Sequence, residues 1–168
     1  YRFDTHDLDL THSHKVLRIR KDNQVILAYK GPALPDSELR IRTEIELVVD
    51  DFDNAVSFLE ALGYSLMVQY EKWRTIYLLN DLEITVDELP YGHFSEIEGE
   101  EETAIRRTAA TLGLNWDCRI DESYLALYDR VKSKLNLPVN NLTFAEFKNL
   151  SISSADLGVN AADIPHFL

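Results

Sequence analysis

Arg42-Thr43-Glu44-Ile45-Glu46-Leu47 is the stretch that decides the fold, because charged and apolar side chains alternate along it. Successive side chains of a β-strand point to opposite faces of the sheet, so this period of two separates a charged face from an apolar face. The alternation therefore predicts a strand with one polar and one buried face, and it places Glu44 and Glu46 on the same side.

The same period continues on both sides of this stretch. Leu17-Arg18-Ile19-Arg20 alternates in the same way upstream, and Ser95-Glu96-Ile97-Glu98 does so downstream. Lys21-Asp22-Asn23 and Asn80-Asp81 supply turn-forming residues between neighbouring segments. The pattern predicts strands near residues 15–21, 24–30, 40–49, 64–70, 72–79, 82–88 and 93–98.

Helical spacing of apolar residues interrupts the strands and then replaces them. Gly63 and Gly113 each follow such a segment, where a glycine commonly ends a helix. Three glutamates from Glu100 to Glu102 favour a helix start. The predicted helices cover residues 51–62, 100–112, 123–135 and 144–150.

Composition limits both the organisation and the function. The 168 residues are 45% hydrophobic, which suffices for one domain, and we expect it to span residues 1–150 and to be followed by a weakly patterned tail over 151–168. A net charge of −12 disfavours nonspecific binding to nucleic-acid backbones or to a membrane surface. Cys118 is the single cysteine, which excludes an intrachain disulfide and suits a cytoplasmic protein.

The charged faces of the strands carry the candidate site. The opposite faces bear large residues such as Ile45, Leu47 and Trp73, which we expect to pack beneath helices. If helices cover the outside of a closed sheet, the charged side chains point into its interior, where each charge must be balanced by an opposite charge. A polyphosphate with Mg²⁺ or Mn²⁺ supplies these opposite charges, because Arg and Lys bind phosphate oxygens while carboxylates bind hard cations. The candidate cations are Arg18, Arg20, Lys30, Lys72 and Arg74, and the candidate carboxylates are Glu44, Glu46, Asp87, Glu96 and Glu98.

Simpler interpretations exist for single residues. Any one charged pair could be part of a solvated ladder of cross-strand ion pairs, but five pairs on one period favour a site. Arg42 shares the face of Glu44 and Glu46, and either binds phosphate or neutralises them. Arg2 and Arg40 are expected to be solvated. His12 and His14 are two residues apart, but no third metal ligand follows them at close spacing. Cys118 is expected to be a packed thiol.

In these residues the chain resembles the CYTH superfamily, also called triphosphate tunnel metalloenzymes, which includes class IV adenylate cyclases, thiamine triphosphatases and inorganic triphosphatases. The resemblance covers about residues 1–135. It rests on Phe3-Asp4-Thr5 with Asp7-Leu8-Asp9-Leu10, Leu17-Arg18-Ile19-Arg20, Tyr29-Lys30-Gly31-Pro32, Arg42-Thr43-Glu44-Ile45-Glu46, Lys72-Trp73-Arg74, Asp87-Glu88 and Gly92-His93-Phe94-Ser95-Glu96-Ile97-Glu98-Gly99, in that order.

The resemblance implies an α+β fold: a closed eight-stranded antiparallel β-barrel, or tunnel, flanked by helices and carrying a C-terminal helical appendage. It implies Mg²⁺ or Mn²⁺ as cofactor and attack of a metal-bound water on the terminal phosphorus. Glu44, Glu46 and Lys72 are the candidate catalytic residues. The implied triphosphate ligands are Arg18, Arg20, Lys30, Arg42, Lys72 and Arg74, and the implied metal ligands are Glu44, Glu46, Asp87, Glu96 and Glu98.

Two features depart from the family pattern. The family's opening strand, Glu-x-Glu-x-Lys, should precede Phe3, and we expect it to lie before residue 1 rather than to be lost. The family often has a lysine before Ser-Tyr on the C-terminal helix, whereas Asp121 and Glu122 precede Ser123-Tyr124 here. The second departure puts one phosphate contact in doubt.

The leading functional prediction is hydrolysis of inorganic triphosphate or of a small organic triphosphate such as thiamine triphosphate. The nearest alternative is a class IV adenylate cyclase that converts ATP to cyclic AMP and pyrophosphate with much the same side chains. An alternative of another class is a noncatalytic polyphosphate-binding module. The expected partner is a small-molecule triphosphate, with neither nucleic acid nor membrane, and residues 121–168 are a candidate homodimer contact or lid.

Overall fold

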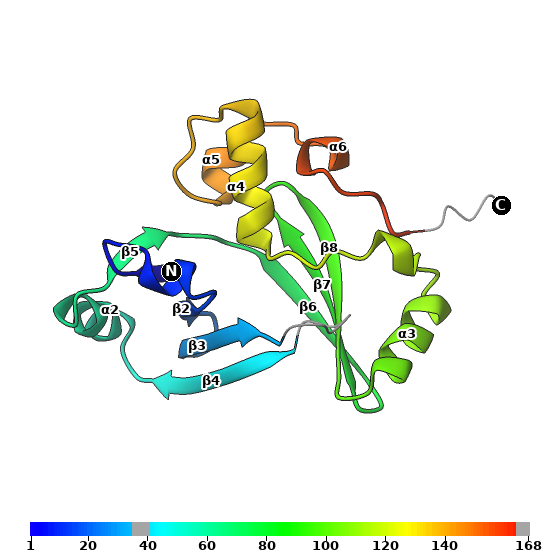
Figure 1. The fold of residues 1–168 in the computed structure, drawn as a ribbon, viewed down its shortest axis with the longest axis horizontal. Helices are drawn as coiled ribbons and strands as arrows, with labels where there is room; N and C mark the ends of the chain where they lie inside the picture. Colours follow the sequence, from blue (N-terminus) through cyan, green and yellow to red (C-terminus); the bar gives the residue numbers. More distant parts are fainter. Residues whose placement is uncertain (35–40, 164–168) are drawn as a thin grey trace. The chain divides into compact units, whose positions relative to one another are not determined.

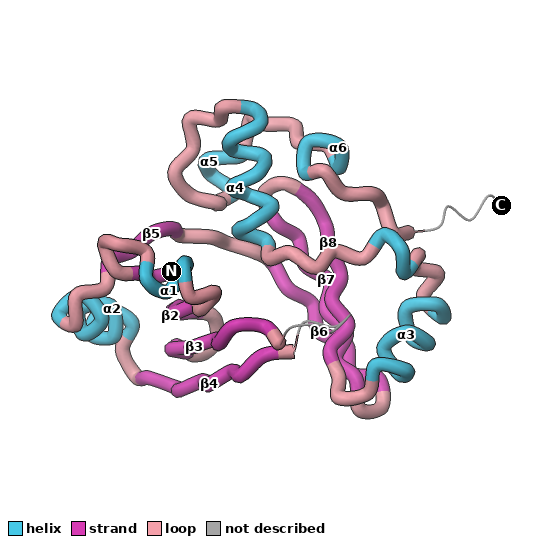
Figure 2. The backbone as a smooth tube through the Cα atoms, viewed as in Figure 1, coloured by secondary structure: helices cyan, strands magenta, loops and turns pink. Residues whose placement is uncertain are grey.

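The computed structural model describes residues 1–34 and 41–163, and it shows a mixed α/β fold with antiparallel sheets (Figure 1). The chain divides into two compact units, the first over Tyr1–Tyr70 and the second from Glu71 onward. Each unit is built around its own sheet (Figure 2). No helix within the described ranges is long and apolar enough to cross a membrane.

The first unit contains a five-stranded sheet with strand order β4-β3-β2-β1-β5. The two helices of this unit are α1 (Asp9–His12) and α2 (Phe52–Ala61). Its strands are β1 (Arg2–Asp4), β2 (Val16–Lys21), β3 (Val25–Ala33), β4 (Arg42–Val49) and β5 (Ser65–Val68).

Helix α2 supplies the core of the first unit. The Asp51 carboxylate caps its N-terminus by accepting a 2.7 Å hydrogen bond from Asn54 N. Leu59 of α2 is buried against Phe3 and Ile19, so the apolar face of the sheet packs on the helix. The alternation along β2 thus leaves Arg18 and Arg20 on the opposite, polar face.

The second unit contains a three-stranded sheet with order β6-β7-β8. Its strands are β6 (Trp73–Leu79), β7 (Leu82–Leu89) and β8 (Gly92–Glu98), which lie side by side in Figure 2. Its helical segments are α3 (Glu102–Thr111), a 3₁₀ turn (Trp116–Cys118), α4 (Tyr124–Leu135), α5 (Phe144–Phe147) and α6 (Ser154–Leu157).

Helix α4 is held in place by contacts along its whole length. The Ser123 hydroxyl caps its N-terminus by accepting from Ala126 N. Near the same end, the Tyr91 hydroxyl donates a 2.7 Å hydrogen bond to the Tyr124 carbonyl. Leu127 and Val131 are fully buried within the unit. Tyr124 therefore sits at a fixed helix start.

The predicted closed barrel differs from the structure. The described strands form two separate sheets, and within the described ranges no ladder joins one sheet to the other. A closed barrel requires every edge strand to find a partner. Charge alternation shows which side chains share a face but does not show which strands pair, so the sequence could not distinguish one closed sheet from two open ones.

The apolar faces are also less covered than expected. Ile45 and Leu47 on β4 are 52% and 55% exposed, and Trp73 on β6 is 71% exposed. Both strands lie at an edge of their sheet. The expectation that these three residues pack beneath helices was wrong.

Several boundaries also changed. Strand β1 was not predicted, and α5 is shorter than the predicted helix 144–150. Helix α6 lies where a weakly patterned tail was expected, and Lys134 and Arg130 of α4 donate to the carbonyls of Ala155 and Leu157. Arg40, expected to be solvated, lies outside the described residues. The domain boundary near residue 150 stays a prediction.

Candidate functional site

The polar face of the first sheet gathers most of the predicted phosphate ligands. The strand register places Arg18 across from Ala28 and Ala28 across from Glu46, while Lys30 lies across from Glu44. We call this surface the cationic face. Its basic residues are Arg2, Arg18, Arg20, Lys30 and Arg42, and its acidic residues are Glu44, Glu46 and the buried Asp4 at the end of β1.

The Glu44 and Glu46 carboxylates of the cationic face are already engaged by the cations. Lys30 Nζ lies 2.7 Å from Glu44 Oε2, and Arg42 Nε donates to Glu44 Oε1 at 3.0 Å. Arg18 is 3.9 Å from Glu46, which is a weak ion pair, and its Nη1 donates to the Tyr70 hydroxyl at 3.0 Å. Arg20 pairs with Asp22 in the β2–β3 turn at 3.4 Å.

Electrostatics show that the cations of this face are crowded. Burial lowers the pKa of Lys30, and the nearby positive charges of Arg18 and Arg42 lower it further, although the Glu44 carboxylate opposes them. Burial tends to raise the pKa of Glu44, but its hydrogen bonds to Lys30 and Arg42 outweigh burial and leave the pKa lowered. Cations outnumber carboxylates here, so the face has chemistry suited to an anion.

A second group of predicted residues surrounds Asp87 on β7. The Asp87 side chain is fully buried. Lys72 Nζ lies 2.8 Å from its Oδ2, while Arg74 donates from Nε to Oδ1 at 2.7 Å and from Nη2 to Oδ2 at 2.6 Å. The same Nη2 of Arg74 also contacts Glu96 Oε2. We call Lys72, Arg74, Asp87, Glu96 and Tyr124 the Asp87 cluster.

Tyr124 is the member of this cluster that sequence reasoning missed. Its hydroxyl donates to Asp87 Oδ2 at 2.9 Å, and Lys72 Nζ lies 5.4 Å from its ring centre. Burial and the carboxylates of Glu96 and Asp87 raise the pKa of Tyr124, so the phenol stays protonated and acts as a donor. The signal in the sequence was Ser123-Tyr124 at the start of the predicted helix, which we considered only for the lysine that precedes it in relatives.

The cluster keeps Asp87 ionised despite its burial. Burial tends to raise the pKa of Asp87, but the hydrogen bonds from Arg74 and Lys72 outweigh it and leave the pKa lowered. Burial likewise opposes the charge of Arg74, yet its contacts with Asp87 and Glu96 raise its pKa overall. Glu98 lies two residues beyond Glu96 on the same face of β8, across from Glu83.

The carboxylate oxygens of this cluster are ligands of the kind that a hard divalent cation prefers. One cationic atom, Arg74 Nη2, bridges the carboxylates of Asp87 and Glu96. The hydroxyl of buried Thr85, which lies across from Glu96, has no hydrogen-bond partner in the described part of the chain. Mg²⁺ usually takes one or two protein carboxylates together with substrate phosphates. Within residues 1–34 and 41–163, the structure does not bring three or more His, Cys, Asp or Glu side chains together in a group that could hold a metal ion.

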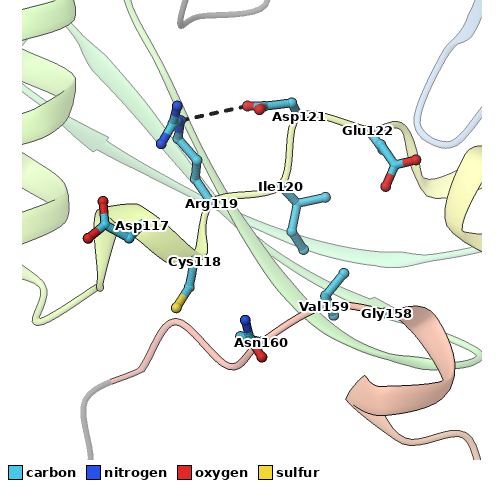
Figure 3. Close-up of a pocket in the computed structure, with 9 residues that line it drawn as sticks. All are labelled: Asp117, Cys118, Arg119, Ile120, Asp121, Glu122, Gly158, Val159 and Asn160. Atoms are coloured by element: carbon cyan, nitrogen blue, oxygen red, sulfur yellow. Dashed lines mark ion pairs between the residues drawn. The ribbon is translucent and has the colours of Figure 1, made fainter.

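Two surface pockets lie apart from these residues. Figure 3 shows one of about 250 Å³, formed by residues 117–122 and 158–160 of the second unit. Another, of about 370 Å³, lies around the β7–β8 turn and residues 150–152. Neither pocket is lined by a predicted phosphate or metal ligand.

Known proteins share the sequence pattern and the fold of this chain. The CYTH domain matches residues 2–113, more than half of the 168 residues. The chain belongs to the CYTH domain family. Every predicted ligand of this CYTH domain lies inside the matched range, whereas Tyr124 lies beyond it.

Individual relatives support the same assignment. A Methanocaldococcus jannaschii protein named putative adenylate cyclase is 32% identical over 94 residues, which are 55% of this chain and 53% of that protein. The chain therefore spans about half the length of the curated relative it matches. A structure described as a putative adenylate cyclase from Vibrio parahaemolyticus is 26% identical with a TM-score of 0.61, covering 77% of this chain and 78% of that chain. The PH1012 protein of Pyrococcus horikoshii is 26% identical with a TM-score of 0.64, covering 74% and 77%.

Proposed function

We propose that this CYTH domain is a divalent-metal-dependent triphosphatase acting on inorganic triphosphate or a small organic triphosphate. The observation that carries the proposal is the unequal distribution of charge. Cations exceed carboxylates on the cationic face, whereas Asp87, Glu96 and Glu98 gather on one face of the second sheet. A metal–triphosphate complex matches this distribution, because its phosphates are negatively charged and its metal ion is positively charged.

In this proposal the cationic face binds the phosphates. Guanidinium groups such as those of Arg18 and Arg42 donate paired N–H groups to phosphate oxygens, and Lys30 adds a point charge. These contacts orient the phosphoryl group and stabilise the charge that develops during transfer. Arg20 of the same face, and Lys72 and Arg74 of the second unit, remain candidate triphosphate ligands.

The carboxylates have a different proposed role. Asp87, Glu96 and Glu98 are the proposed ligands of Mg²⁺ or Mn²⁺ in the second unit, and Glu44 and Glu46 are the candidate metal ligands of the first unit. A bound cation of this kind neutralises phosphate charge and lowers the pKa of water. Tyr124 orients the Asp87 carboxylate through its hydrogen bond of 2.9 Å. Glu44 and Glu46 position the attacking water, and Lys72 takes the developing negative charge of the phosphoryl group.

A class IV adenylate cyclase is the second candidate. The observation that favours it is the name of the relatives, since both the M. jannaschii and the V. parahaemolyticus proteins are described as putative adenylate cyclases. The cyclase would direct the ribose 3′-hydroxyl of ATP, instead of water, at the α-phosphate. The homodimer contact and the cytoplasmic location stay predictions.

The test is phosphate release from tripolyphosphate in Mg²⁺, in Mn²⁺ and in EDTA, with Glu98→Ala as the site variant. Glu60→Ala is the control, because Glu60 is an exposed residue of α2. Metal-dependent release that Glu98→Ala abolishes and Glu60→Ala retains supports the triphosphatase. Cyclic AMP formed from ATP without release of phosphate supports the cyclase. Tight binding of tripolyphosphate without either product indicates a noncatalytic binding module.

A further inference from the structure

Arg2 occupies a place in the structure that its sequence position does not indicate. We expected it to be solvated, but it lies on β1 directly across from Arg18 on β2. Both side chains belong to the face that carries Glu46, because Arg18 is aligned with Ala28 and Ala28 with Glu46. Arg2 is partly buried there.

Two arginines in this arrangement repel each other. Directly opposed residues of antiparallel strands have Cβ atoms only about 4.5–5.5 Å apart, and like charges at such positions are destabilising. Glu46 offers little compensation, since it is 3.9 Å from Arg18. Across residues 1–34 and 41–163, Arg2 forms no ion pair, and the buried Nε of Arg18 has no hydrogen-bond partner. Within the described ranges the pair therefore has only the distant Glu46 carboxylate of Arg18 as an ion-pair partner.

Both guanidinium groups are nevertheless held in position. Arg2 Nη2 donates to the Thr11 hydroxyl at 3.0 Å. That hydroxyl donates in turn to Asp4 Oδ2 at 2.7 Å, and Asp4 is fully buried. Arg18 is held from its own side by the Tyr70 hydroxyl. Donors that are fixed before binding lose little entropy when a ligand arrives.

We propose that Arg2 is a further triphosphate-binding residue, and that with Arg18 it forms a two-arginine subsite for one phosphate group. A phosphate placed against both guanidinium groups removes their mutual repulsion and accepts N–H groups that are otherwise unused. This inference rests on the proposed function, because it requires the cationic face to bind triphosphate. It assigns to Arg2 a role that the charge pattern did not reveal, because strand β1, which carries Arg2, was not predicted from the sequence.

The test is the affinity for tripolyphosphate, measured by calorimetry in EDTA so that metal-dependent turnover cannot occur. Arg2→Gln removes the charge but keeps an N–H group that can donate to Thr11. It should raise Kd about tenfold, the loss of one charge-assisted contact. Arg2→Lys should raise Kd less than Arg2→Gln. Arg107→Gln, an exposed position on α3 with the same change of net charge, should leave Kd within about twofold.

The melting temperature of the ligand-free protein separates binding from a structural role. If Arg2 binds phosphate, Arg2→Gln relieves repulsion and does not lower the melting temperature. A lower melting temperature with an unchanged Kd would mean that Arg2 only anchors Thr11, and would overturn the inference. An unchanged Kd for Arg2→Gln while Arg18→Gln weakens binding overturns the inference alone. If Arg18→Gln also leaves Kd unchanged, the proposed function fails together with it.

Discussion

Asp4 offers the sharpest test of how the sequence builds the first unit. Its carboxylate is fully buried and accepts hydrogen bonds from four donors, one in the following loop and three in helix α1. Oδ1 accepts from the backbone N–H groups of Thr5 and Leu10, and Oδ2 accepts from the N–H and hydroxyl groups of Thr11. Asp4→Asn keeps the shape of the side chain but replaces one acceptor oxygen by an NH₂ group.

The size of the effect follows from these contacts. In the asparagine variant the NH₂ group faces at least one buried N–H, because the Leu10 and Thr11 amides lie on different oxygens. An unsatisfied buried donor costs about 1–3 kcal/mol, and the remaining bonds lose the strengthening that a charged acceptor gives. We expect a loss of about 3 kcal/mol of unfolding free energy, which lowers Tm by about 6–12 °C for a chain of this size.

The pH dependence of Asp4→Asn provides an independent check. Burial tends to raise the pKa of Asp4, but its hydrogen bonds to Thr11, Leu10 and Thr5 outweigh burial and lower it below 3.8. A lowered pKa means that the ionised form contributes stability above pH 3.8 and that this contribution is lost as pH falls through the folded pKa. The stability difference between the parent and the variant should therefore be full at pH 7 and should narrow below pH 3.8.

Urea unfolding followed by circular dichroism measures this difference, and hydrogen exchange at the Leu10 and Thr11 amides locates it. Asp7→Asn is the matched control, because Asp7 is exposed in the same loop and loses the same charge. The reasoning is refuted if Asp4→Asn and Asp7→Asn unfold at the same urea concentration. It is also refuted if the difference between Asp4→Asn and the parent is as large at pH 3 as at pH 7.

Three further predictions concern the second unit. Asp87→Asn should lower the unfolding free energy of this unit by about 2 kcal/mol, because it weakens the contacts of Lys72 and Arg74. Unfolding followed by tryptophan fluorescence measures this loss, and the control Asp121→Asn, at a side chain that is 72% exposed, should show none. Tyr124→Phe should lower kcat for triphosphate hydrolysis about tenfold with little change in KM, because Asp87 loses the hydrogen-bond donor that positions it. Tyr77 is exposed, so an equal loss of kcat in Tyr77→Phe would contradict this role of Tyr124. Ser123→Ala should cost about 1 kcal/mol as the cap of α4 is lost, and a thermal melt that matches the parent would show that the cap contributes nothing.

Local patterns predicted the parts of the fold that depend on neighbours in sequence. The period of two placed Glu44 and Glu46 on one face of a strand, and both lie on the polar face of β4. Helix ends could also be predicted, since the predicted helix 123–135 matches α4 with its Ser123 cap. In both cases the signal extends over only a few residues.

Features that depend on strand pairing could not be predicted in the same way. Arg2 shares a face with Arg18 only because β1 pairs with β2, and the sequence of residues 1–4 does not predict that register. Tyr124 reaches Asp87 across 37 positions of sequence, so a phenol on an ordinary helix start becomes part of a charged cluster. The closed barrel was implied by the family resemblance, and the alternation of faces gave no information on which strand edges pair. Each of these results depends on contacts between distant segments, which the spacing of residue types does not encode.

Local charge, and not net charge, decides which ligand this protein can bind. The chain carries a net charge of −12, which would disfavour any polyanion if the charge were evenly spread. It is not evenly spread, because the cationic face combines more basic than acidic side chains within one sheet. At physiological salt, screening over about 8 Å reduces the influence of distant carboxylates, while partly buried cations beside a bound phosphate are screened much less. We therefore propose that this acidic chain binds a compact polyphosphate and repels an extended nucleic acid, whose charges would reach beyond the cationic face.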